Sequence, residues 1–132
     1  MSSGASIALG LLIGLLAASA AQAGFDGSKP FLCAITETVT CSEAGDCERG
    51  SAADVGLPDF VTVDVPGKML REHGDGDRSS PITSSQKIDG ELVLQGVQDH
   101  AWSAIVTPRG RLRASAAGGE GGFLLFGVCT DR

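Results

Sequence analysis

The sequence predicts a small all-β domain, either an antiparallel up-and-down meander or a closed barrel, of about eight strands. From residue 59 onward, short apolar runs alternate with turn signals at intervals of about ten residues, which is typical of a β-sandwich or barrel. These runs are too short for helices, and the 19 Gly and 5 Pro residues interrupt any helical pattern. The short connections favour hairpins, because parallel strands need crossovers of about a dozen residues.

Eight segments have the alternating or β-branched composition of strands. The first ends in TETVT, and the second reads FVTVDV. In chain order, the expected strands are residues 31–40, 60–65, 68–72, 82–88, 91–97, 102–107, 111–116 and 123–129. Residues 42–58 and 73–80 are expected to be irregular.

Turn residues between these segments support the meander. Asp89-Gly90 is the strongest two-residue hairpin signal in the chain. Pro66-Gly67 predicts a type II turn, and residues 107–110, Thr-Pro-Arg-Gly, predict a type I turn. We expect the meander to close into a barrel, because closure removes exposed strand edges.

The first 23 residues are expected to be a cleaved signal peptide. Residues 7–17 read IALGLLIGLLA, an apolar run that is shorter than the roughly 20 residues of a membrane span. Ala21-Gln22-Ala23 then matches the A-x-A pattern of a cleavage site, although no Lys or Arg precedes the apolar run. The alternative is a short buried helix. Cleavage leaves residues 24–132 as a single β domain, exported to the periplasm or secreted.

The four cysteines, Cys33, Cys41, Cys47 and Cys129, allow three pairings. Cys33 and Cys41 lie on one predicted strand, about 26 Å apart, whereas a disulfide needs Cα atoms within about 7 Å. Two pairings remain. With an even strand count, the last strand ends beside the start of the first, which predicts Cys33–Cys129 and Cys41–Cys47. An odd count would instead direct Cys129 toward Cys41.

Charge and composition exclude two classes of partner. The chain has 10 Lys and Arg residues against 16 Asp and Glu residues, a formal net charge of −6, so nucleic acid is not expected as a partner. A membrane barrel needs lipid-facing strands of about 9 to 11 residues and aromatic girdles. Here the runs are mostly shorter, Tyr is absent and Trp102 is the only Trp. We therefore expect no transmembrane span in residues 24–132.

The candidate catalytic and metal-ligating residues form no known motif. Asp75-Gly76-Asp77 resembles the start of a calcium loop but lacks its later ligands, so a plain turn is the preferred interpretation. His73 and His100 are isolated, and the cysteine spacing differs from that of structural zinc sites. G-x-S-x-G, H-E-x-x-H and P-loop motifs are absent. We expect no catalytic residues, metal or cofactor, and a protein that is not an enzyme.

Arg109, Arg111 and Arg113 alternate along one predicted strand and therefore project from one side. They are either an anion-binding patch or a solvated outer face. The acidic remainder of the domain favours the solvated face, with Leu112, Ala114 and Ala116 pointing inward.

The run LQGVQDHAWSAIVTPRGRLRASAAGGEGGFLLFGVCT, the earlier LPDFVTVDV and the three early cysteines together resemble a group of small exported bacterial proteins of unknown function. The resemblance covers most of residues 24–132 and implies no activity or site residues. The strand pattern is also loosely similar to lipocalin-like proteins, but no lipocalin motif is present.

The inward faces contain small residues that leave room for a ligand or fill a narrow barrel: Gly96, Ala104, Ala114 and Ala116. The run FLLFGV is apolar on both faces, which favours a contact surface for a partner. We therefore expect a non-catalytic module of the cell envelope that binds a small apolar ligand or an envelope protein. The alternative is a structural or interaction protein without a cavity, and an enzyme ranks third.

Overall fold

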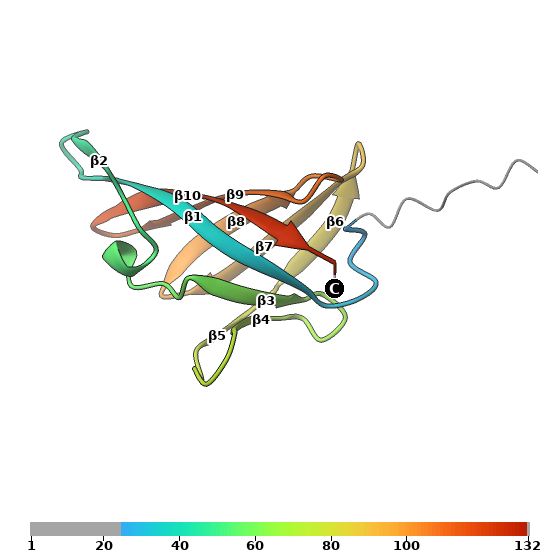
Figure 1. Cartoon of the computed structure of the whole chain (residues 1–132). Helices are drawn as coiled ribbons and strands as arrows, with labels where there is room; N and C mark the ends of the chain where they lie inside the picture. Colours follow the sequence, from blue (N-terminus) through green and yellow to red (C-terminus); the bar gives the residue numbers. More distant parts are fainter. Residues whose placement is uncertain (1–24, 132) are drawn as a thin grey trace, which may run out of the picture.

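The computed structural model describes residues 25–131, so the predicted signal peptide lies outside the described residues. This part of the chain forms a curled antiparallel β-sheet with one short 3₁₀ turn, η1 (Figure 1). The strands are β1 (Phe31–Cys41), β2 (Cys47–Gly50), β3 (Phe60–Asp64), β4 (Met69–Glu72), β5 (Ser79–Pro81), β6 (Ser84–Ile88), β7 (Glu91–Gln98), β8 (His100–Val106), β9 (Arg111–Gly118) and β10 (Gly121–Thr130), and η1 spans Ala53–Val55. The predicted all-β class is confirmed.

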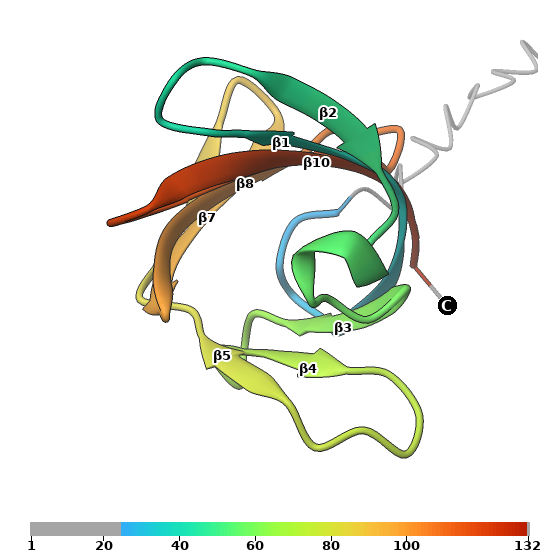
Figure 2. The same ribbon diagram turned by 90° about the vertical axis from the view of Figure 1, so that its left-hand side faces the viewer.

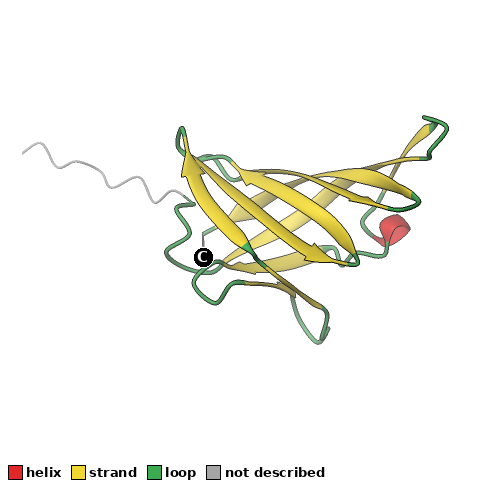
Figure 3. Cartoon of the chain, turned by 180° about the vertical axis from the view of Figure 1, so that it is seen from behind, coloured by secondary structure: helices red, strands yellow, loops and turns green. Residues whose placement is uncertain are grey.

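The sheet has the order β5-β4-β3-β1-β10-β9-β8-β7-β6, and β2 pairs with β1 outside this path. Its two edges, β5 and β6, are consecutive in the chain and separated by Ile82 and Thr83. The Ile82 amide donates to the Lys68 carbonyl at 3.0 Å, and the Thr83 amide donates to the Gln95 carbonyl at 2.8 Å. Residues 79–88 thus form one bent segment. Its first part, β5, pairs with β4 and its second part, β6, pairs with β7, so the two edges of the sheet meet (Figure 3). If β5 and β6 are counted as one strand and β2 is left out as part of a side hairpin, the sheet has the predicted eight strands.

Alternation along the strands decides which side chains enter the barrel. On β9, Leu112 and Ala116 are buried while Arg111 and Arg113 are exposed, so these arginines occupy an outer face as predicted. On β1, a bulge at Thr36 shifts the register between Ile35 and Glu37. The bulge lets both halves of an 11-residue strand keep a row of side chains inside.

The turns agree with the sequence at two predicted positions and differ at a third. Asp89 and Gly90 have φ values of 51° and 83°, as a two-residue type I′ turn requires, and the Gly110 amide donates to the Thr107 carbonyl at 2.9 Å. The predicted type II turn at Pro66-Gly67 is wrong, because Lys68 and not Gly67 adopts the positive φ, 55°. The Asp64 carboxylate accepts a hydrogen bond from the Gly67 amide at 2.8 Å and so favours the observed turn.

Two segments expected to be irregular contain regular structure. Residues 42–58 include β2 and η1, and the predicted loop 73–80 includes the start of β5. Both strands are short, polar and paired along one side only, so their sequences lack the apolar alternation of the longer strands.

Both predicted disulfides are present, Cys33–Cys129 and Cys41–Cys47, with Cα–Cα distances of 4.0 and 4.1 Å. Each joins residues that lie directly opposite each other in an antiparallel pair. Cys33 is fully buried in the core, whereas the second bond closes the β1–β2 hairpin.

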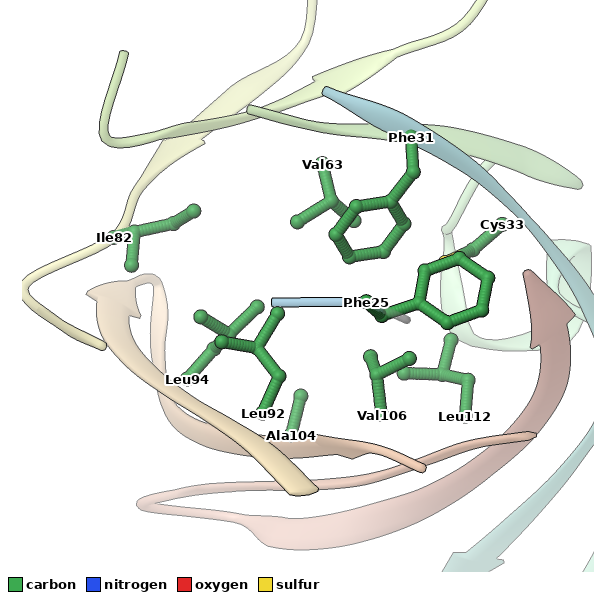
Figure 4. Close-up of a cluster of buried hydrophobic side chains, with 10 residues drawn as sticks. All are labelled: Phe25, Phe31, Cys33, Val63, Ile82, Leu92, Leu94, Ala104, Val106 and Leu112. Carbon is green, nitrogen blue, oxygen red and sulfur yellow. The ribbon is translucent and has the colours of Figure 1, made fainter. Parts of the chain in front are cut away.

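The core fills one end of the barrel, which we call the closed end. It contains the turns β3–β4, β6–β7 and β8–β9, and residues 25–30 cover it. The Phe25 and Phe31 rings pack edge to face there, with centroids 5.0 Å apart. Figure 4 shows these two rings among the buried side chains of Val63, Leu92 and Val106.

Candidate functional site

An apolar cavity of about 640 Å³ occupies the interior toward the opposite end, which we call the open end. The open end contains η1 and the connections β4–β5, β7–β8 and β9–β10. Figure 2 views the barrel from this side, with η1 lying across the interior. The volume falls within the range of about 300 to 1,000 Å³ that is usual for small-molecule sites.

Side-chain size along β8 and β9 explains why the cavity exists. Val106 lies opposite Leu112 near the closed end. Farther along the same two strands, Ala104 lies opposite Ala114, and Trp102 lies opposite Ala116. Small side chains at these inward positions leave the barrel unfilled above a packed base, and all three alanines line the cavity.

Other apolar residues complete the wall. They come from β1, β3, β4, β7 and β10 and from the segment around η1, and include Ile35, Val61, Val63, Leu70, Leu94, Phe123, Leu125, Val55 and Leu57. The cavity is therefore enclosed by most of the sheet rather than formed by one loop.

Gly96 has a different role from the one its small size suggests. It lies opposite Trp102 on the β7–β8 ladder, and a Cβ atom there would overlap the indole ring. The glycine therefore makes room for Trp102 and does not line the cavity, so the second of the two expectations, a close fit in a narrow barrel, holds for Gly96. A glycine that leaves a void and a glycine covered by a cross-strand neighbour look the same in a sequence.

The Trp102 side chain forms a hydrogen bond within the cavity wall. Its Nε1 donates to Ser80 Oγ at 3.0 Å, which links β8 to β5 across the junction of the two sheet edges. The indole and Ser80 both line the cavity. Since Trp102 is the only Trp in the sequence, its fluorescence reports on this site alone.

Hydrogen bonds and an ion pair hold the segment that crosses the open end. The Asp54 carboxylate accepts from the Ser51 amide at 2.6 Å and from the Ser51 hydroxyl at 2.8 Å, which lowers the pKa of Asp54. Arg78 pairs with Glu72 at 2.9 Å and also donates to the Gly56 carbonyl. The hydrogen bond from Arg78 lowers the pKa of Glu72 and raises that of Arg78.

The residues considered for catalysis or metal binding are not brought together. His73 Nδ1 lies 3.2 Å from Thr62 Oγ1, whereas the His100 ring packs against Phe123 with centroids 6.0 Å apart. In the described part of the chain, no group of three or more His, Cys, Asp or Glu side chains is placed to hold a metal ion. Among residues 25–131, no helix is long and apolar enough to cross a membrane.

The run FLLFGV separates into an inner and an outer face. Phe123 and Leu125 line the cavity, whereas Leu124, Phe126 and Val128 are exposed on the outside of β10. This outer row is a second candidate surface, distinct from the cavity.

Comparison with protein-family models, with curated proteins and with solved structures found no match to this chain. The geometry of the cavity and its rim is therefore the basis for a function.

Proposed function

We propose that this protein is an exported, non-catalytic β-barrel module that binds a small apolar ligand inside the barrel. The observation that carries the proposal is the cavity of about 640 Å³, lined mainly by apolar and small side chains. Burying the apolar surface of a ligand there gains roughly 25 cal/mol per Å² removed from water, before the cost of immobilising the ligand.

Two features support export to the periplasm or to the outside of the cell. Disulfides persist in oxidising compartments, and Cys33–Cys129 and Cys41–Cys47 engage all four cysteines of the chain. The predicted signal peptide at residues 1–23 provides the route.

A second candidate function is contact with an envelope protein through the outside of β10. The exposed row of Leu124, Phe126 and Val128 favours it, because contiguous apolar surface often marks an interaction site. The cavity is the stronger basis, because it is enclosed on several sides and has an anchored aromatic residue in its wall.

Titration with N-phenyl-1-naphthylamine, an uncharged apolar fluorophore, tests the proposal. We expect saturable enhancement of probe fluorescence, quenching of Trp102 emission and a one-to-one complex in native mass spectrometry. Ala114→Leu should abolish binding because the added side chain enters the cavity. Ala117→Leu is the matched control, because Ala117 is exposed in the same strand, β9, and does not line the cavity, and this variant should bind normally. Equal binding by both variants, or none by the wild type, would contradict the proposal.

A further inference from the structure

The two ends of the barrel differ in charge. The connections at the open end are residues 42–46, 51–59, 73–78, 99 and 119–120. They contain eight acidic residues: Glu43, Asp46, Asp54, Asp59, Asp75, Asp77, Asp99 and Glu120. Arg78 is the one Lys or Arg residue in these five segments.

At the closed end, by contrast, basic residues offset the acidic ones, which include Asp26, Asp64, Asp89 and Glu91. Lys29 lies in the segment that covers this end, Lys68 and Lys87 border its turns, and Arg109 lies in the β8–β9 turn. The charge asymmetry therefore follows the axis of the barrel and gives the mouth of the cavity a negative potential.

The charged residues that border the cavity itself have the same bias. Arg71 and Arg78 are both engaged by acids, at 2.8 Å by Asp64 and at 2.9 Å by Glu72. Among residues 25–131, Asp77 and Asp99 also border the cavity, and neither forms an ion pair. The uncompensated charge at the rim is therefore negative.

From this asymmetry we infer that the ligand is a cationic amphiphile, with an apolar body inside the barrel and a positively charged head group at the acidic rim. The inference rests on the proposed function, because it assigns the head group of a molecule whose body fills the same cavity. A charged head remains at the mouth because burying it among apolar side chains carries a large desolvation cost. At the mouth, the low-dielectric walls strengthen the field of the surrounding carboxylates, which attracts a cation and repels a carboxylate.

Three amphiphiles with the same twelve-carbon chain test this selectivity: dodecyltrimethylammonium, dodecyl maltoside and dodecanoate. Each is titrated below its aggregation concentration against the wild-type protein, with Trp102 emission and displacement of N-phenyl-1-naphthylamine as readouts. We expect the cation to bind about tenfold more tightly than dodecanoate at low salt, with the uncharged compound between them. Added salt should narrow the difference, because it screens the charges at the exposed rim.

Two matched double variants test whether the rim carboxylates cause the preference for the cation. Asp77→Asn with Asp99→Asn removes two rim charges, and Asp89→Asn with Glu91→Gln removes two charges at the closed end. The backbones are comparable, because Asp99 and Asp89 have positive φ values of 60° and 51°, which Asn also accepts. The rim variant should lose about threefold or more of the preference for the cation, and the closed-end variant should retain it.

The outcomes separate the two proposals. If dodecanoate binds as tightly as the cation, or if the rim variant keeps the full preference, the head-group inference is wrong while the cavity remains a binding site. If neither the uncharged fluorophore nor any of the three amphiphiles binds, both the proposed function and the inference are overturned.

Discussion

The two ends of this barrel are built from the same strands, but the interior is filled by side chains at one end and hollow at the other. At the closed end, Phe25, Phe31 and Leu112 meet in a packed core, whereas at the open end Ala104 and Ala114 face a cavity. An eight-stranded barrel is just wide enough to be filled by side chains or to hold one small ligand. The comparison shows that residue size along two strands, β8 and β9, decides between these states within one molecule.

The covers of the two ends differ as well. Phe25 precedes the first strand and is only 8% exposed, so the closed end is covered by apolar burial. The segment over the open end is held by polar contacts, including the Ser51–Asp54 hydrogen bonds and the Glu72–Arg78 ion pair. Exposed polar contacts contribute less to stability than buried apolar groups, so the open end should open first.

Removing the disulfide next to the core should have the largest effect. Cys33 and Cys129 are 96 residues apart, and a loop of about that length stabilises a protein by roughly 4 to 5 kcal/mol on the chain-entropy model. Replacing both with Ser should lower Tm by at least about 12 to 24 °C, the shift that about 3 kcal/mol produces in a domain of about this size. Calorimetry measures the change.

The hairpin disulfide provides the comparison. Cys41 and Cys47 are six residues apart, so their replacement with Ser should cost at most about 2 kcal/mol. Equal losses from the two double variants would show that the long-range bond has no special role at the packed end.

Phe31→Ala should come next, at about 3 kcal/mol or more, because Phe31 is 4% exposed and packs against Phe25. Ala114→Leu adds volume at the open end and should change stability little, since the cavity accepts the side chain. Urea unfolding of both variants measures the difference. A small loss for Phe31→Ala with a large one for Ala114→Leu would reverse the assignment of filled and hollow ends.

Gly96→Ala should cost about 1 to 3 kcal/mol, because the added methyl group overlaps both the Trp102 indole and the backbone carbonyl of Pro81. Trp102 emission should shift at the same time. An unchanged emission spectrum would show that the position of the indole does not depend on the glycine.

Acidification should have the smallest effect and should loosen the segment over the open end. The pKa of Glu72 is lowered from its ordinary value of 4.5 by the hydrogen bond from Arg78, so its contribution to stability is complete above about pH 5. That contribution is lost as the pH falls through 4.5 toward the lower pKa of the folded state. Hydrogen exchange around η1 should therefore increase over this pH range, because Arg78 also donates to the Gly56 carbonyl. Glu72→Gln should weaken this pH dependence, and an unchanged dependence in that variant would contradict the role of the ion pair.

Much of the fold could be predicted from the sequence because long strands with alternating side chains carry a strong signal. The eight main strands, the inward row on β9 and both disulfides follow from alternation, turn residues and an even strand count. Short polar segments carry little signal, so β2 and the start of β5 were expected to be irregular.

The cavity was only partly predictable. Ala104, Ala114 and Ala116 indicated available space, but whether another side chain fills it depends on cross-strand neighbours, as Gly96 and Trp102 show. The acidic rim could not be recognised from the sequence, because its residues belong to five separate connections that only the barrel topology brings to one end.

Both ends of the described chain lie on the same side of the molecule. Phe25 packs into the closed end, and β10 finishes there, where Cys129 bonds to Cys33 (Figure 1). Any tether attached near residue 25 or residue 131, whether a fused carrier protein or an immobilising surface, therefore attaches opposite the mouth of the cavity. A protein immobilised by either terminus would present its binding site to the surrounding solution.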